Sequence, residues 1–139
     1  MDDQTVELLP QKPPMVVIAG GEDIADGEAA AYAIADRSSL FYDPEVDGVP
    51  GCAALEYMAQ TMAFAVGARR RRHGDAPKVG FVLGSRKLEI RIPVFSCEQR
   101  YRVTAKCDFT DEEYASFDCA IADERGVIVA SAALTAFQP

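Results

Sequence analysis

The 139-residue sequence has no tryptophan and a single histidine, His73. No run of about 18 apolar residues is free of charge, so we expect no membrane insertion. The cysteines Cys52, Cys97, Cys107 and Cys119 form no C-x-x-C pair, and one histidine offers little for a zinc site. We therefore expect buried thiols and no metal. The net charge of −8 argues against nucleic acid as a partner, since phosphate-binding surfaces are usually basic.

Repeats, low-complexity tracts and linkers are also missing. The acidic start, Met1-Asp2-Asp3-Gln4, lacks the basic residues of a secretory signal, and we expect a cytoplasmic protein. Apolar residues make up 49% and charged residues 26% of the chain, as in ordinary globular proteins. The length predicts a single domain over residues 1–139, large enough to bury a core.

The segment from Gly51 to Arg72 has no proline and is rich in alanine, leucine, methionine and glutamate, which predicts a helix. Before its four terminal arginines, its only clearly polar side chains are Glu56, Gln60 and Thr61. A helix that is apolar on nearly every face is buried in a core or a bilayer, and the length and basic end exclude the bilayer. Five side chains should be nearly fully buried: Leu55, Met58, Ala59, Met62 and Val66.

Strand patterns surround this helix in the sequence. Residues 101–109 alternate apolar and polar side chains with period two, which is typical of a half-buried strand. Asp26-Gly27 and Asp123-Glu124-Arg125-Gly126 are hairpin signals. The pattern predicts an α+β fold, with a curved antiparallel sheet wrapped around one long helix. We expect strands at Met15–Ile18, Glu28–Asp36, Val79–Leu83, Leu88–Val94, Tyr101–Phe109, Tyr114–Ala122 and Val127–Phe137, and irregular segments at Leu8–Pro14 and Ser38–Pro50.

Glu56 and Gln60 are four residues apart and so share one face of the predicted helix. Burying a carboxylate is unfavourable unless it is paired, and proteins accept this where a carboxyl group does acid–base chemistry. Alternatively, the two residues mark the one edge of the helix that contacts water. The spacing alone leaves both interpretations open.

Pro50-Gly51 opens the helix and leaves its first amides, those of Gly51 and Cys52, open to a carbonyl oxygen at the positive helix end. By itself this dipeptide is typical of an ordinary helix start. With Glu56 one and a half turns later, it describes a site in which amides hold a developing oxyanion beside a carboxylic acid.

The segment from Tyr42 to Gln60 reads Y-D-P-E-V-D-G-V-P-G-C-A-A-L-E-Y-M-A-Q. It resembles the active-site segment of the bacterial 3-hydroxyacyl-carrier-protein dehydratases, which reads H-F-P, then P-G, then E-A-M-A-Q. The matching positions, reached without a gap, are Pro44, Pro50, Gly51, Glu56, Met58, Ala59 and Gln60.

The resemblance extends over nearly the whole chain. It is closest to the dehydratase-like subunits encoded in aryl-polyene pigment clusters, on the L-G-x-R segment at Leu83–Arg86, on Ser116–Ala120 and on the ending Phe137-Gln138-Pro139. It implies a hotdog fold and a dimer whose active sites lie between two subunits, with helices side by side and sheets joined edge to edge.

In the dehydratases, a histidine removes the proton next to the thioester carbonyl. A carboxyl group from the facing subunit protonates the departing 3-hydroxyl, and helix amides stabilise the enolate. The resemblance assigns the carboxyl group to Glu56, next to Gln60, and the amides to Gly51 and Cys52. It implies no cofactor except the phosphopantetheine arm that an acyl carrier protein or coenzyme A delivers.

The sequence departs from the family at the histidine, where it has Tyr42. No shift of register brings a histidine into this loop. His73 follows Glu56 by seventeen residues, which is roughly 25 Å along a continuous helix and too far for one site within a chain. Tyr42 is no simple replacement, because the unperturbed pKa of tyrosine is about 10.

Three functions are open, in this order of preference. In the first, the chain supplies half of a dehydratase site and forms a heterodimer with a His-bearing hotdog dehydratase; a homodimer of this chain would lack the usual base. In the second, the chain is a hotdog thioesterase that uses Glu56 and the helix amides without a histidine. In the third, it is an acyl-binding or scaffolding subunit without catalytic activity.

The run Arg69-Arg70-Arg71-Arg72 also has two interpretations. Cations at a helix C-terminus complement the helix dipole, and this ordinary explanation is favoured. Alternatively, the run helps to attract an acidic acyl carrier protein. Other candidates for such a basic patch are Arg86, Lys87, Arg91, Arg100 and Arg102.

Overall fold

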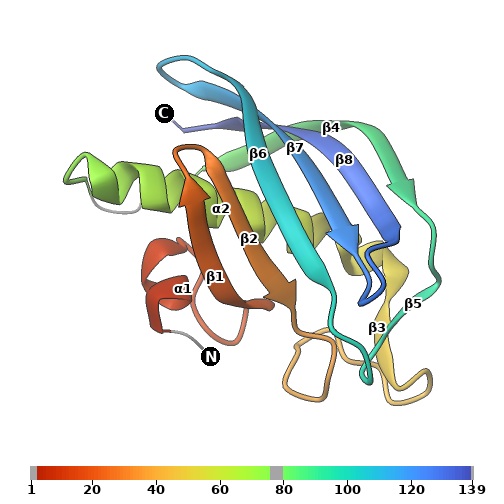
Figure 1. Ribbon diagram of the computed structural model, residues 1–139. Coiled ribbons are helices and arrows are strands. Elements are labelled where there is room, and N and C mark those ends of the chain that lie inside the picture. The colour runs from red at the N-terminus through yellow and green to blue at the C-terminus, as the bar shows by residue number, and fades with distance from the viewer. Residues whose placement is uncertain (1–2, 76–79, 139) are drawn as a thin grey trace.

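The computed structural model describes residues 3–75 and 80–138. Its main layers are one long helix and a six-stranded sheet (Figure 1). The sheet has the order β1-β2-β6-β7-β8-β4 with all neighbours antiparallel, and β3 and β5 form a separate two-stranded sheet. The elements are α1 (Asp3–Leu8), β1 (Ile18–Ala25), β2 (Glu28–Ala33), β3 (Gly48–Pro50), η1 (Gly51–Ala53), α2 (Ala54–Arg72), β4 (Phe81–Ile90), β5 (Val94–Ser96), β6 (Arg102–Thr110), β7 (Tyr114–Ala122) and β8 (Ile128–Phe137).

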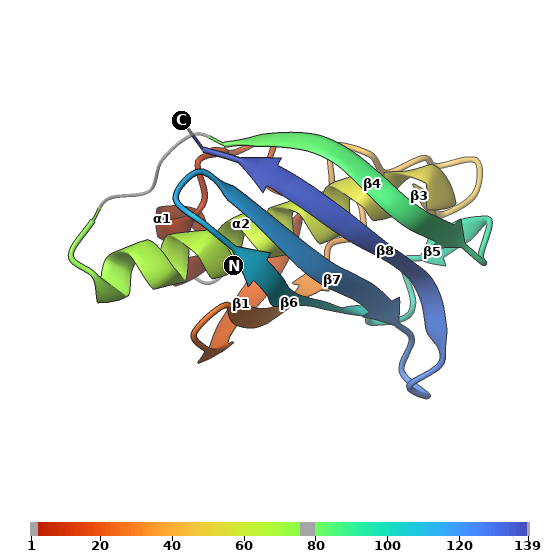
Figure 2. The same cartoon turned by 90° about the horizontal axis from the view of Figure 1, so that it is seen from above.

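The strands cross α2 obliquely and curve over it, as the view from above shows (Figure 2). The helix packs its buried aromatic and methionine side chains, including Tyr57, Met58 and Phe64, against the sheet. Phe117 and Leu134 are fully buried on the sheet side of the same core. This packing explains the apolar helix sequence, and it confirms the expected α+β hotdog arrangement.

The expected helix begins at Gly51, but its first turn is the 3₁₀ helix η1, and α2 follows without a break. Gly51 packs too tightly for a side chain, since a Cβ there would lie 2.3 Å from the Ile92 carbonyl oxygen. At the other end, His73 is the C-cap and Gly74 has a positive φ of 78°. Glycine adopts this conformation without strain, which suits the end of the helix.

Four strand predictions differ from the structure. The strand expected at Glu28–Asp36 ends at Ala33, as β2. The strand expected at Met15–Ile18 begins only at Ile18, because Met15 and Val17 bond to the side chain of Gln60 instead of to a strand. The two strands expected around Gly84-Ser85 are one strand, β4, which bulges near Lys87 and pairs with β8 along its length. Val79, the expected start of the first of them, lies outside the described residues.

The helix α1 was not expected from the sequence, which predicted no helix before Leu8. This short helix packs against α2, and its Leu8 and the following Leu9 are fully buried. The contact depends on Gly67, since a Cβ at that position would lie 2.1 Å from the Leu8 carbonyl oxygen. At the same end, Thr5 Oγ1 accepts a hydrogen bond of 2.9 Å from the Gly21 amide.

The burial predictions hold only in part. Met58 and Met62 are buried, but Leu55, Ala59 and Val66 are half-buried, because each of them lines a hollow beside α2. The cysteine prediction is also corrected. Cys119 is buried, and burial raises its pKa to about 12, whereas Cys52 is exposed and Cys97 and Cys107 are half-buried.

Two findings concern membranes and metals. Over residues 3–75 and 80–138, no helix is long and apolar enough to cross a membrane. In the same part of the chain, no three histidine, cysteine or acidic side chains gather where they could hold a metal ion.

Candidate active site

Glu56 lies in the first turn of α2 and is half-buried. Its side chain lines two hollows that meet at this residue. One is a groove of about 340 Å³ that follows α2 towards its C-terminus. The other is an apolar pocket with Phe41, Pro50, Cys52 and Leu55 in its wall. A carboxyl group at the junction of two hollows can meet a ligand that passes from one to the other.

Gln60 fixes the position of this carboxyl group. Its Nε2 donates to Glu56 Oε1 at 2.9 Å and to the Met15 carbonyl oxygen at 2.8 Å, and its Oε1 accepts from the Val17 amide at 2.9 Å. Gln60 is fully buried, so it is not at a wet edge of the helix. Because two backbone groups hold its carboxamide, Gln60 presents its N–H to Glu56 in one orientation. The bond uses Oε1 of the carboxylate.

The expectation of two open amides at the helix start is corrected for Gly51. Its amide donates to the Pro93 carbonyl oxygen at 2.8 Å, because β3 and β5 pair directly before and after these residues. Cys52 is exposed and lies beside Glu56 in the apolar pocket. An amide in the first turn of a helix has no acceptor within the helix, so the Cys52 amide stays the candidate oxyanion donor.

Tyr42, at the position of the family's histidine, does not line either hollow that Glu56 lines. Its hydroxyl donates to Asp47 Oδ1, and the Arg37 guanidinium lies 5.0 Å from the centre of its ring. The hydrogen bond to Asp47 raises the pKa of Tyr42 above its usual value. The phenol therefore stays protonated at neutral pH and is not suited to be a base.

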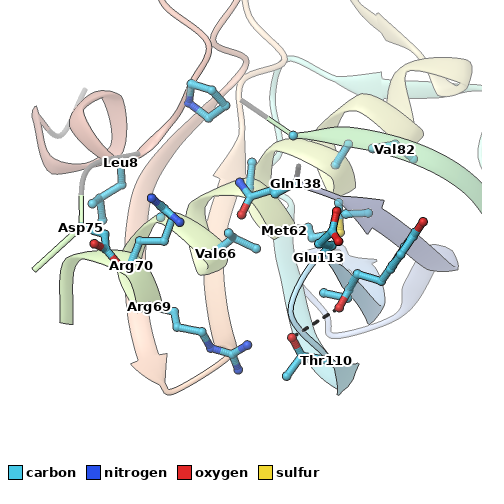
Figure 3. A pocket seen from close by; sticks show the side chains of 18 of the residues that line it. Leu8, Met62, Val66, Arg69, Arg70, Asp75, Val82, Thr110, Glu113 and Gln138 are labelled. Carbon is cyan, nitrogen blue, oxygen red and sulfur yellow. Dashed lines mark hydrogen bonds between the residues drawn. The ribbon is translucent and has the colours of Figure 1, made fainter. Parts of the chain in front are cut away.

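The groove is lined on one side by small and apolar side chains of α2 and on the other by the ends of β4, β7 and β8 (Figure 3). Met62 and Val66 project into it from the helix, and Val82 and Gln138 face them. His73 lies at its far end, one helix length from Glu56. The sequence did not predict this groove, although its half-buried side chains from α2 recur with helical spacing, at Ala59, Ala63 and Val66.

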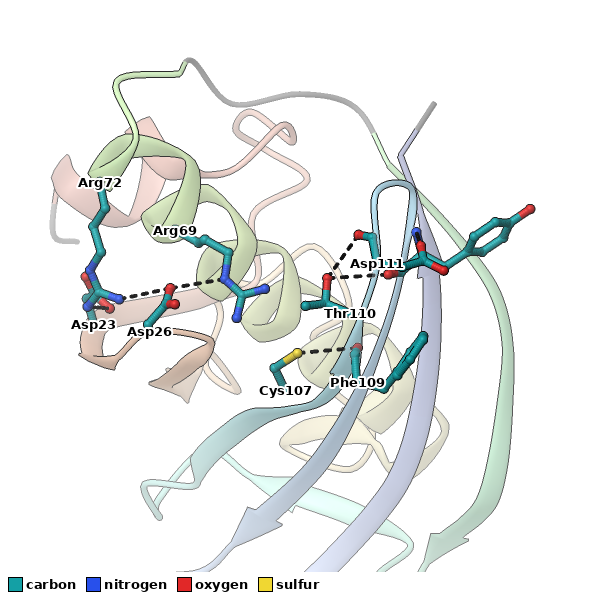
Figure 4. A network of polar contacts seen from close by, with 9 residues as sticks. Asp23, Asp26, Arg69, Arg72, Cys107, Phe109, Thr110 and Asp111 are labelled. Atoms are coloured by element: carbon teal, nitrogen blue, oxygen red, sulfur yellow. Dashed lines mark hydrogen bonds and ion pairs between the residues drawn. The ribbon is translucent and has the colours of Figure 1, made fainter.

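The arginines at the end of α2 bind acidic side chains of the first elements (Figure 4). Arg69 pairs with Asp26 at 3.1 Å and Arg72 with Asp23 at 2.6 Å. The hydrogen bond from Arg69 holds the pKa of Asp26 below its usual value. Arg71 binds Glu7 of α1 at 3.0 Å, and Arg70 also has a partner. These contacts favour the ordinary interpretation, in which the basic run anchors and complements the helix end.

A family model described as ApeP dehydratase matches residues 4–139, and thus almost the whole chain. The chain belongs to the ApeP-like dehydratase family. Among solved structures, this ApeP-like chain is similar to the dehydratase heterocomplex ApeI:P from Xenorhabdus doucetiae. The two chains share 24% identity with a TM-score of 0.89, over 97% of this chain and 90% of the other.

Other solved structures share the fold with lower TM-scores. A hypothetical thioesterase from Streptococcus pneumoniae TIGR4, solved with coenzyme A, is 17% identical with a TM-score of 0.66, over 86% of the ApeP-like chain and 84% of its own. The E. coli PaaI protein from the phenylacetic acid degradation operon is 13% identical with a TM-score of 0.65, over 86% and 82%. Both likenesses show the fold alone. Among curated proteins, no sequence matches this ApeP-like chain.

Proposed function

We propose that this chain is the acid-bearing subunit of a 3-hydroxyacyl-[acyl-carrier-protein] dehydratase, with Glu56 as the acid. The observation that carries the proposal is the carboxyl group of Glu56, which Gln60 holds by one oxygen at the junction of two hollows. Membership of a dehydratase family indicates that the reaction at this carboxyl group is a dehydration.

The reaction removes a proton from C2 of the acyl chain and the hydroxyl group from C3. Glu56 donates its proton to that hydroxyl, which leaves as water. A base takes the C2 proton, and the electron pair of the broken C–H bond forms the C2–C3 double bond. In this proposal the Cys52 amide binds the thioester oxygen, which gains negative charge as the C2 proton leaves.

Among the described residues, neither the histidine nor Tyr42 can serve as a base beside Glu56. The single histidine of the chain is at the far end of the groove, and Tyr42 is held protonated by Asp47. A second subunit with a histidine in the loop equivalent to residues 38–50 supplies the base in this proposal. The likeness to one chain of a dehydratase heterocomplex supports a pair of unlike subunits.

Two surfaces of the chain suit such a partner. Edge strand β4 is exposed along its length from Val82 to Ile90, and its Leu83 and Leu88 are exposed apolar residues. An unprotected edge of this kind pairs readily with another strand. Near the start of α2, half-buried Leu55 forms a second, smaller apolar surface. A partner helix and sheet edge would bury both surfaces together.

The substrate arrives on a phosphopantetheine arm in this proposal, and the chain needs no other cofactor. We infer an acyl carrier protein as the donor and the cytoplasm as the place of reaction. Arg69, Arg71 and Arg72 of the basic run form ion pairs. Of the other candidates for carrier docking, Arg86, Lys87 and Arg100 are exposed and have no ion-pair partner among the described residues.

Single-turnover dehydration of a 3-hydroxyacyl-carrier-protein tests the proposal, with the chain alone and with a His-bearing hotdog partner added. We expect little turnover by the chain alone and a restored rate with the partner. Glu56→Gln should then lower that rate roughly 10²–10⁴-fold, as expected for the loss of a general acid. The exposed Glu98→Gln is the matched control and should leave the rate unchanged.

Three outcomes contradict the proposal in different ways. Brisk dehydration by the chain alone, retained in Tyr42→Phe, removes the argument from the missing base. Thioester hydrolysis without dehydration makes the chain a thioesterase. A partner-dependent rate that is unaffected by Glu56→Gln leaves this subunit a scaffold.

A further inference from the structure

Gln11 has a buried polar atom that the proposed reaction does not explain. The residue lies in the segment between α1 and β1 and lines the groove next to Leu8 and Pro10. Its Oε1 is buried and accepts no hydrogen bond, the sole such side-chain atom found over residues 3–75 and 80–138. A buried acceptor without a donor is unfavourable, and a turn of the side chain towards the groove would expose it to a ligand.

Two contacts of the neighbouring residues show where Gln11 lies along the axis of α2. Before it, Leu8 lies against Gly67, and after it, the Met15 carbonyl oxygen bonds to Gln60. Gln11 therefore lies between the levels of Gln60 and Gly67. With a rise of 1.5 Å per residue, this is roughly 6–17 Å beyond Glu56 along the helix.

The two hollows at Glu56 differ in what they offer a substrate. The pocket with Phe41, Pro50 and Leu55 is apolar and suits an acyl chain. The groove is lined by Ala59 and Ala63, with polar side chains further along. A slender chain that carries its own hydrogen-bond donors matches this second environment, and the pantetheine part of a thioester substrate is such a chain.

The distance from the reacting carbon to the amides of the pantetheine arm agrees with the position of Gln11 along α2. An extended amide chain advances about 3.5 Å for every three bonds, which puts the two amide nitrogens of pantetheine at roughly 7 Å and 12 Å from the reacting C3 carbon. The more distant amide falls near the middle of the range that Gln11 spans. Its N–H is a donor of the kind that Gln11 Oε1 lacks.

We propose that the groove along α2 takes the pantetheine arm of the substrate, and that Gln11 Oε1 accepts a hydrogen bond from the more distant amide of that arm. The acyl chain then occupies the apolar pocket, and Glu56 stands where the two parts join. This inference rests on the proposed function and assigns Gln11 as a binding residue for the arm.

The test compares two ligands in which an amide replaces the thioester, so that neither can react. One carries the whole pantetheine arm, and the other ends after the nearer amide, as in N-acetylcysteamine. Calorimetric titration of the full chain, in the assembly in which it purifies, should show the longer ligand binding roughly fivefold tighter through this hydrogen bond. In Gln11→Met this advantage should disappear while the affinity for the shorter ligand is unchanged.

Two further variants separate binding from folding. Gln11→Glu keeps an acceptor and should keep most of the advantage of the longer ligand. Gln99→Met, at an exposed position, is the matched control and should behave as the wild type. The melting temperature of Gln11→Met should be unchanged or raised, because the variant removes an acceptor that has no donor.

Equal weakening of both ligands in Gln11→Met, or no weakening, overturns the inference. A third result would also overturn it. If a hydroxyl at the end of the acyl chain makes the short ligand bind more tightly, and Gln11→Met removes that gain, the acyl tail and not the arm occupies the groove. None of these results depends on turnover. A failed dehydration assay together with the expected binding pattern would count against the proposed function and leave the arm site standing.

Discussion

Gln60 donates a hydrogen bond from Nε2 to Oε1 of Glu56 over 2.9 Å, across one turn of α2. The other two bonds of the same carboxamide end on the backbone of Met15 and Val17, more than 40 residues earlier in the chain. The candidate acid, the helix and the segment before β1 are therefore one hydrogen-bonded unit. A change at Gln60 should act on stability and on the site together.

Gln60→Leu should lower the free energy of unfolding by about 2–4 kcal/mol. It leaves the Val17 amide and the Met15 carbonyl without their partner in the interior, and each unsatisfied group costs roughly 1–3 kcal/mol. Urea denaturation measures the change, with the exposed Gln99→Leu as the control. A loss below about 1 kcal/mol would show that water or another side chain replaces these bonds.

Tyr42→Phe should change the partner-dependent dehydration rate by less than about threefold, since the hydroxyl is bonded to Asp47 and faces neither hollow at Glu56. The raised pKa of Tyr42 adds a pH criterion: a rate that depended on its phenolate would rise about tenfold per pH unit from neutral pH and level off only above about pH 10, the unperturbed value. The rate of the wild type and of Tyr42→Phe should therefore follow the same profile from neutral pH upwards. A separation of the two profiles on the alkaline side would assign a role to the phenol.

The local sequence pattern was sufficient to predict the main layers of the fold. The apolar run with a basic end predicted α2, and Gly27 and Gly126, both with positive φ, lie in the two expected hairpin turns. The same run could not show that Leu55 and Val66 are half-buried. Their exposure depends on the hollows beside α2, which form only when distant segments pack together.

The errors have their causes in contacts between distant segments. Gly84-Ser85 has the composition of a turn, but pairing with β8 keeps β4 extended through it. The open amide expected at Gly51 is closed by Pro93, which only the pairing of β3 with β5 brings near. The spacing of Glu56 and Gln60 correctly placed them on one face. It could not show that Gln60 is fixed by backbone groups from before β1.

The cysteines should differ widely in reactivity. Thiolate is the reactive form, and burial raises the pKa of Cys119 to about 12, so only about one thiol in 10⁴ is ionised at pH 8. Exposed Cys52 should react with iodoacetamide first, and Cys119 only when the protein unfolds. Mass spectrometry of the time course measures both, and early labelling of Cys119 would contradict the buried core.

The same labelling tests the apolar pocket. Because Cys52 shares this pocket with Glu56, its alkylation should abolish partner-dependent dehydration. Cys52→Ser should keep the activity and resist inactivation, since the proposed oxyanion donor is the backbone amide. Inactivation of Cys52→Ser at the wild-type rate would place the sensitive thiol elsewhere.

Gly67→Ala should destabilise the protein, against the usual preference of helices for alanine. In a helix interior, alanine is favoured over glycine by about 1 kcal/mol. Here the new Cβ would lie 2.1 Å from the Leu8 carbonyl oxygen, and backbone cannot yield as a flexible side chain does. Either α1 moves away and exposes Leu8 and Leu9, or α2 shifts in the core. We expect a net loss of about 2–4 kcal/mol, because exposing even one leucine costs about 1.5–3 kcal/mol.

The matched control is Gly84→Ala, where no atom lies within 4 Å of the new Cβ. Its free energy of unfolding should stay within about 0.5 kcal/mol of the wild type, as for most surface substitutions. Urea denaturation measures the free energy of unfolding of both variants. The prediction is tested by whether Gly67→Ala lowers or raises this free energy. If alanine at position 67 stabilises the protein, α1 does not pack on α2 through this glycine. The groove would then lose the wall that carries Leu8 and Gln11, so the result bears directly on the proposed arm site.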